Sequence, residues 1–245
     1  MIITASPFFD ENDLLEIRCR EMAGLVDAHL IVEANLTYTG QPKPWNFEPE
    51  RFAAWPIIYQ CVELPLRNPD GTRMKAWDRE DIHRKKVFEF VKMLHPEVVL
   101  YLDIDECPRM SALGHFRKLG VPTARLEMDD LRYRADLVDR SHLWMNPYIT
   151  LHDPKVTREP GRYNFAAPWP VIPETGWHFC WMGGKEKILN ATRAISHYEE
   201  DCGIAFAERI AAGQQPGRDR LQPYPTSSLP DCVRANPGKW PILFQ

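Results

Sequence analysis

The sequence Val98-Val99-Leu100-Tyr101-Leu102-Asp103-Ile104-Asp105 decides both the fold and the site, because an apolar run leads directly into two carboxylates one residue apart. Such a run is typical of a buried strand, and in open α/β sheets ligands bind beyond the carboxyl ends of the strands. Mg2+ and Mn2+ take oxygen ligands and bridge phosphates. The stretch therefore predicts a cation site at the tip of an inner strand, with a nucleotide diphosphate as the first ligand to consider.

Strand and helix patterns alternate around this stretch over the first hundred residues. Apolar residues spaced at i, i+3, i+4 and i+7 from Val87 indicate a helix, and Asp10 or Asn12 could cap an earlier one. The alternation favours a mostly parallel, Rossmann-like sheet covered by helices. We expect strands at 2–5, 29–33, 57–64 and 98–102, and helices at 10–25 and 76–94.

The second half of the chain has a different pattern. Alternating polar and apolar residues indicate mixed or antiparallel strands, and six prolines within 214–241 predict an extended tail packed on the body. The expected fold is therefore α/β, a mixed sheet flanked by helices in a single domain, 1–245. The segments are strands at 124–128, 131–135, 143–150 and 177–182, a loop at 159–173, and a helical face over 188–195.

Composition excludes several classes of protein. With 30 basic and 34 acidic residues the formal charge is −4, and no long basic block occurs, so nucleic acid is not an expected partner. The six cysteines lack zinc-site spacing, which disfavours zinc and a disulfide framework. No run approaches the roughly 20 apolar residues of a membrane span. The first strand begins at Ile2, which leaves no room for a signal peptide, so we expect a cytoplasmic protein.

Basic and acidic side chains gather at the start of the 76–94 helix. This end of the helix should lie near Asp103, where Arg79 or Arg84 could neutralise a diphosphate through paired contacts. Glu80 and Arg84 are also one helical turn apart, so they could instead form a surface ion pair worth about 0.3–0.5 kcal/mol. Both alternatives stay open, as does a pairing of Arg109 with the aspartates.

Two further patches carry aromatic and imidazole groups. Glycines flank an aromatic strand that contains Trp177, His178 and Trp181, and sugars stack their apolar faces on such rings. Tryptophans in a strand also commonly belong to a core. His197 could complete a cation shell with the aspartates, or could be an ordinary structural histidine.

Taken together and in this order, these motifs resemble glycosyltransferase family 17. The resemblance extends from about residue 3 to residue 200 and implies a GT-A type fold, a UDP-sugar donor, a divalent cation and inversion at the anomeric carbon. The family includes the enzyme that adds the bisecting N-acetylglucosamine to N-glycan cores. The motifs are residues 6–18, Ile31-Val32-Glu33-Ala34-Asn35 with Thr37, Gly40, Pro42 and Lys43, then Trp77-x-Arg79-Glu80, Asp103-x-Asp105-Glu106-x-Pro108, Gly176-Trp177-His178-Phe179 and His197-x-Glu199.

The resemblance also implies roles for individual residues. The cation, Mn2+ or Mg2+, is expected on Asp103, Asp105 and His197, and N-acetylglucosamine is the first sugar expected. Glu199 is the first candidate for the catalytic base and Glu106 the second. The donor is expected on Glu33, Arg79, Glu80, Arg84 and Asp103, and a glycan acceptor on Trp177, His178 and Trp181. Residues 1–110 would form the nucleotide-sugar half, 111–213 the acceptor half and 214–245 the tail.

Two rival functions share some of these features. A haloacid-dehalogenase-like phosphatase also has a strand followed by two aspartates, but that motif usually opens the chain and here about a hundred residues precede Asp103. An inactive glycan-binding module could use Trp177 and Trp181 without catalysis. Retention of both aspartates and His197 favours the metal-binding enzyme.

Overall fold

A computed structural model of the chain describes residues 1–141, 143–153, 155, 168–196 and 221–245. Within these residues a mixed sheet has the order β10-β7-β6-β8-β4-β1-β2-β3, and β9 lies between β6 and β5. The strands are β1 (Ile2–Phe8), β2 (Ala28–Ala34), β3 (Ile57–Val62), β4 (Val98–Tyr101), β5 (Glu106–Pro108), β6 (Thr123–Arg132), β7 (Leu137–Asp139), β8 (Tyr148–Leu151), β9 (Val171–Cys180) and β10 (Leu221–Pro223). The helices are α1 (Asn12–Glu21), α2 (Ala76–Leu94), α3 (Ser111–Leu119), α4 (Gly184–Thr192) and α6 (Asp231–Ala235), with short 3-10 turns between some elements.

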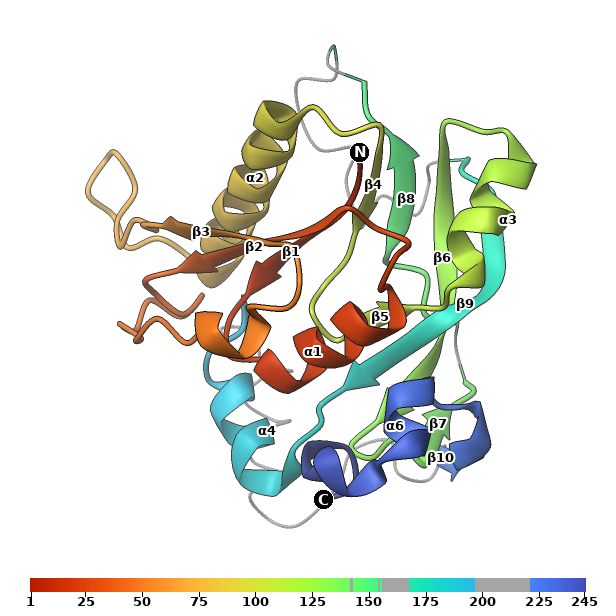
Figure 1. Cartoon of the computed structure of the whole chain (residues 1–245). Helices are drawn as coiled ribbons and strands as arrows, with labels where there is room; N and C mark the ends of the chain where they lie inside the picture. The colour runs from red at the N-terminus through yellow and green to blue at the C-terminus, as the bar shows by residue number, and fades with distance from the viewer. Residues whose placement is uncertain (142, 154, 156–167, 197–220) are drawn as a thin grey trace.

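The first half is a parallel sheet with helices on both faces (Figure 1). Every residue of β2 is buried, as expected for a central strand. Successive side chains of a strand point to opposite faces, so Leu30 joins the cluster that includes Val87 and Val91 of α2, whereas Ile31 joins the cluster of Leu14 on α1. The predicted Rossmann-like sheet flanked by helices is confirmed.

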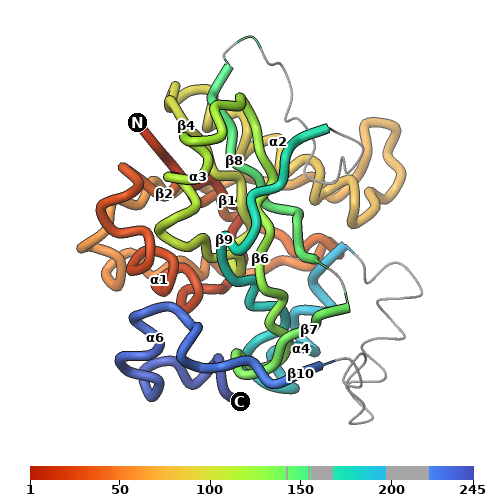
Figure 2. Tube along the Cα trace, turned by 90° about the vertical axis from the view of Figure 1, so that its right-hand side faces the viewer, coloured from red at the N-terminus to blue at the C-terminus, as the bar shows by residue number. Residues whose placement is uncertain are grey.

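The second half adds strands of mixed direction, as predicted. β8 runs antiparallel to β4, and β6 pairs first with β8 and then, in parallel, with β9. Figure 2 shows β6 and β9 side by side. Because β6 changes partner without a break, it is one ten-residue strand rather than the two predicted at 124–128 and 131–135. β9 begins at Val171, so the loop expected at 159–173 ends earlier than predicted.

The helices match the prediction to different degrees. The bounds of α2 are those predicted, but α1 is shorter than the expected 10–25. Its N-cap is Glu11 and not Asp10 or Asn12; Asn12 instead donates from Nδ2 to the carbonyl of Asn46, 2.8 Å away. Across the described residues, every helix is too short or too polar to cross a bilayer.

The C-terminal segment was predicted to be an extended tail packed on the body; for residues 221–245 the packing is observed, but beyond β10 the chain is not extended. After β10 they form α6 and several 3-10 turns, which lie beside α1 and α4 at the lower end of Figure 1. Pro237 and Pro241 begin two of these turns, because a proline ring already has the φ of a first helical residue. Trp240 is 1% exposed and Leu243 fully buried, in the core cluster that contains Leu14. The segment is therefore part of the core.

Candidate functional site

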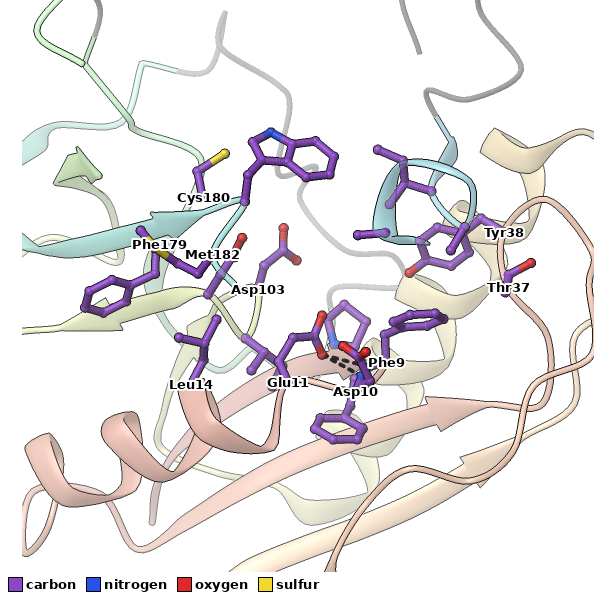
Figure 3. A pocket seen from close by; sticks show the side chains of 18 of the residues that line it. Phe9, Asp10, Glu11, Leu14, Thr37, Tyr38, Asp103, Phe179, Cys180 and Met182 are labelled. Atoms are coloured by element: carbon purple, nitrogen blue, oxygen red, sulfur yellow. Dashed lines mark hydrogen bonds between the residues drawn. The ribbon is translucent and has the colours of Figure 1, made fainter. Parts of the chain in front are cut away.

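A cavity of about 400 Å3 lies at the carboxyl ends of β1 and β4. These two strands are neighbours in the sheet. From β1 the chain continues to β2 and β3 on one side, and it then returns to form β4 on the other side of β1. The strand order therefore reverses between β1 and β4. Open α/β sheets bind ligands at such a switch point. Figure 3 shows Asp103 and Glu11 in its centre, with Tyr38 and Thr37 on one side and Cys180 and Met182 on the other. Both halves of the chain therefore contribute walls.

Asp103 lines the cavity in an orientation that several groups fix. Its backbone N–H donates to Oε2 of Glu106 over 2.7 Å, and its carbonyl accepts from the buried guanidinium of Arg18. Its carboxylate forms an ion pair with Arg84, with Nη1 and Oδ1 3.0 Å apart, and Arg84 also pairs with Glu80. Arg84 thus compensates the charge of Asp103.

Asp105 also lines the cavity, and His178 lies beside it. Nε2 of His178 is 3.4 Å from Oδ2 of Asp105, and Nδ1 is 2.8 Å from Oδ1 of Asp130. Burial would lower the pKa of His178, but Asp105 and Asp130 outweigh it and raise this pKa to about 10. Asp105 and Asp130 therefore favour a positive charge at this ring, which a proton or a bound cation can supply. Arg109, the other partner considered for the aspartates, pairs with Asp129 instead.

Of the residues expected to contact substrate, four are placed in the framework around the cavity, outside its described lining. Glu33 is fully buried and binds Lys43 and the hydroxyl of Tyr59, while Glu106 is fully buried behind Asp103. Arg79 is 1% exposed and donates to three backbone carbonyls, and the indole of Trp177 donates to the carbonyl of Ser228. Their placement favours structural roles over direct contact.

The remaining predicted residues divide into two groups. One group, Glu80, Arg84, Asp103, Asp105, His178 and Trp181, lines the cavity together, although the residues come from both halves of the sequence. The other, His197 and Glu199, lies outside the described residues. The basic side chains Lys43, Arg132 and Lys187 line the cavity too, and the sequence analysis had not singled out the last two for the site.

Glu11 is a cavity residue that the sequence analysis missed. Its Oε2 accepts from the backbone N–H groups of Phe9 and Asp10, over 3.0 and 3.1 Å. Burial raises the pKa of Glu11 to about 7, the charges of Asp10 and Asp105 add to the rise, and the two backbone hydrogen bonds oppose it. The signal in the sequence was an acidic residue between the first buried strand and the first helix, where ligands of α/β sheets bind.

One cluster of side chains in the wall has the composition of a metal site. Asp130, His178 and Cys180 have ligand atoms within 4.8 Å of one another. Asp130 also forms an ion pair with Arg132, 2.8 Å away, so it already has a cationic neighbour. A cation near His178 has two candidate positions. One is this cluster, on the Nδ1 side of the ring, and the other is beside Asp105, on the Nε2 side.

Comparisons with known proteins agree with these observations. The family model of glycosyltransferase family 17 matches residues 2–209. The enzyme β-1,4-mannosyl-glycoprotein 4-β-N-acetylglucosaminyltransferase is 27% identical over 118 residues in both Rattus norvegicus and Homo sapiens. Each match covers 44% of this chain but only 21% and 22% of the relatives, about a fifth of their length. The crystal structure of S. aureus TarS 1-349 is similar with a TM-score of 0.41 and 9% identity, over 86% of this chain and 69% of that one.

Proposed function

The chain belongs to glycosyltransferase family 17, and on that premise we propose that it transfers N-acetylglucosamine from a UDP-sugar donor to a hydroxyl of a glycan acceptor. The proposed transfer inverts the anomeric carbon and needs a divalent cation, Mn2+ or Mg2+. Asp103 and Asp105 carry the proposal, because both line a cavity at the point where the strand order reverses. A volume of about 400 Å3 is within the usual range for small-molecule sites.

The side chains beside Asp105 fit a divalent cation. Asp105 is 31% exposed toward the cavity and has an imidazole nitrogen 3.4 Å from its carboxylate. Carboxylate oxygens with one imidazole form a donor set that Mn2+ accepts. Asp105 would hold the cation, with Asp103 and His197 as the further expected ligands. A cation bound there would neutralise the charge that grows on the diphosphate as it leaves.

Basic side chains in the same cavity suit the diphosphate itself. Arg84 is 15% exposed and fixed between Asp103 and Glu80, so its guanidinium is held in place before a ligand arrives. A planar guanidinium can donate two parallel hydrogen bonds to phosphate oxygens. Lys187 lines the cavity as well and lies 3.8 Å from Asp10. We assign Arg84 as the main protein contact of the diphosphate.

An inverting transfer needs a base that takes the proton of the acceptor hydroxyl. Glu199, the first candidate, lies outside the described residues, and Glu106 is fully buried with both oxygens accepting hydrogen bonds. Glu11 lines the cavity with a pKa raised to about 7, mainly by burial, and a base works best when its pKa is near the operating pH. Glu11 therefore joins Glu199 as a candidate base.

Replacement of Asp105 tests the proposed function. Asp105→Ala should lower Mn2+-dependent release of UDP from UDP-N-acetylglucosamine at least about 100-fold, because the cation loses its main protein ligand. Asp81→Ala is the matched control, since Asp81 is exposed and forms an ion pair with Lys85 on the surface of α2. UDP release is measured with Mn2+ and with EDTA, and thermal unfolding shows that both variants fold. Unchanged turnover in Asp105→Ala would refute the metal-dependent mechanism.

A further inference from the structure

The ring of His178 is held in one orientation by the residues around it. The residue is 3% exposed, and its ring stacks on Trp144 with centroids 3.7 Å apart and planes 11° apart. The backbone is fixed as well, because His178 lies opposite Glu106 in the pairing of β9 with β5. The indole of Trp144 donates to Oε1 of the same Glu106 over 2.7 Å, so the stacking ring is also anchored.

The two ring nitrogens have different surroundings. Nδ1 makes a 2.8 Å hydrogen bond with Asp130, which Arg132 holds in turn. Nε2 faces Asp105 across 3.4 Å, a distance beyond the usual 2.7–3.2 Å of an N–H···O hydrogen bond. Two neighbouring ligand atoms of an octahedral cation with bonds of roughly 2.1 Å lie about 3 Å apart. The separation of Nε2 and Oδ2 is therefore close to that of two ligands of one cation.

This arrangement corresponds to a recurrent pattern in metal sites. A histidine that binds a metal through one nitrogen almost always donates its other N–H to a carboxylate, which fixes the ring and its tautomer. We propose that the divalent cation takes the place of the proton on Nε2, so that His178 is a direct ligand beside Asp105, and that Asp130 is the carboxylate that orients the ring by accepting from Nδ1. The inference rests on the proposed function and deepens it, because it names a ligand from the 176–179 motif that we had expected to bind the acceptor.

The other side of the ring is a poorer place for a cation. Asp130, His178 and Cys180 lie close enough to one another, but Nδ1 already makes its hydrogen bond and Arg132 brings a positive charge to Asp130. The Nε2 side instead faces the cavity that also contains Asp103. An imidazole ligand also favours transition-metal ions over Mg2+, so the inference selects Mn2+ from the two candidate cations.

Pulsed electron paramagnetic resonance on Mn2+ bound to the full chain with UDP tests this inference. The wild type should show the coupling of a directly bound nitrogen-14, and His178→Asn should lose it. His29→Asn is the matched control, because His29 is equally buried, binds Thr4 and lies outside the described cavity lining. Asp130→Asn should weaken Mn2+ binding about 10- to 100-fold, as loss of an orienting carboxylate does.

Other outcomes would overturn the inference. A wild type without nitrogen coupling, or a coupling that persists in His178→Asn and vanishes in His197→Asn, would mean that His178 is not a ligand. If His178→Asn fails to fold, Asp130→Asn decides, and unchanged Mn2+ affinity in that variant would reject the assignment. The proposed function is tested separately by Asp105→Ala. If this variant binds Mn2+ as well as the wild type does, the metal-dependent mechanism is refuted. If it loses Mn2+ binding while His178→Asn binds Mn2+ normally, only the role of His178 is rejected.

Discussion

At the scale of single residues, Glu11 combines a function-related position with a cost to stability. Its pKa is raised to about 7, first by burial and then by Asp10, against an ordinary value of 4.5. Between these two values the unfolded chain has lost the proton of Glu11 while the folded chain retains it. Folding stability therefore falls as the pH rises through this window, and the loss is complete above about pH 7.

Glu11→Gln should remove this pH-dependent cost. The amide oxygen of glutamine can still accept from Phe9 and Asp10, because both now donate to the same carboxylate oxygen. We expect the variant to be more stable than the wild type at pH 8, by an amount on the order of 1 kcal/mol, and about equally stable at pH 4.5. Urea unfolding in EDTA at both pH values measures this difference in stability. If Glu11 is the base, a separate assay of turnover should show a loss of activity in the same variant.

Glu63→Gln is the control for this prediction, because Glu63 is exposed and distant in sequence from the cavity segments. It should change stability little at either pH. A Glu11→Gln variant that is no more stable at pH 8 than at pH 4.5, relative to the wild type, would contradict the assigned pKa of Glu11.

Sequence reasoning at the residue scale succeeded where a local pattern was enough. Asp103 and Asp105 follow an apolar run, and the run alone places them at a strand tip in the cavity. The contact of His178 with Asp130 joins residues 48 positions apart and depends on the register of β9 against β6. That register, with its irregularity near Met128, is a property of the folded sheet and was not visible in the sequence.

At the scale of elements, the pairing of β5 with β9 holds the site together. Gly176 lies opposite Pro108, and a Cβ added to Gly176 would be 2.3 Å from the carbonyl oxygen of Cys107. Glycines flank the aromatic strand in the sequence. At Gly176 the backbone that approaches is that of β5, the strand that begins with Glu106.

Gly176→Ala should therefore be strongly destabilising. The methyl group forces β5 away from β9 and disturbs the hydrogen bond from Phe179 to the carbonyl of Asp105. We expect a loss of at least about 2 kcal/mol in the free energy of unfolding, measured with urea.

Gly114→Ala provides the matched control for this prediction. Gly114 lies within α3, and its added Cβ meets no atom within 4 Å. Alanine there should stabilise the protein by about 0.5–1 kcal/mol, since glycine costs about that much in a helix. Equal effects of the two substitutions would show that β5 does not limit the space at Gly176.

Periodicity predicted some elements well and others poorly, for physical reasons. The end of α2 was predicted correctly because apolar residues repeat at helical spacing from Val87 to Leu94 and His95 and Pro96 follow. The C-terminal segment has no such repeat, and its prolines can begin helical turns as readily as they can extend a chain. Its burial of Trp240 comes from contacts with distant parts of the chain.

At the scale of the whole molecule, the cavity exists because three distant parts of the chain meet. The parallel half supplies Glu11 and Asp103, the mixed half supplies His178, and the C-terminal segment supplies Ile242. The placement of these walls follows from the sheet order, in which β4 connects the two halves. The central claim is that this shared cavity binds a nucleotide diphosphate through a cation on Asp105.

Thermal unfolding with UDP tests that claim most directly, using the wild type and Asp105→Ala, each with Mn2+ and with EDTA. A ligand at about 100 times its dissociation constant adds roughly 2.7 kcal/mol of stability, which raises the midpoint of a chain of this length by about 5–10 °C. The account predicts this rise only for the wild type with both UDP and Mn2+. An equal rise in EDTA, or in Asp105→Ala with Mn2+, would contradict it.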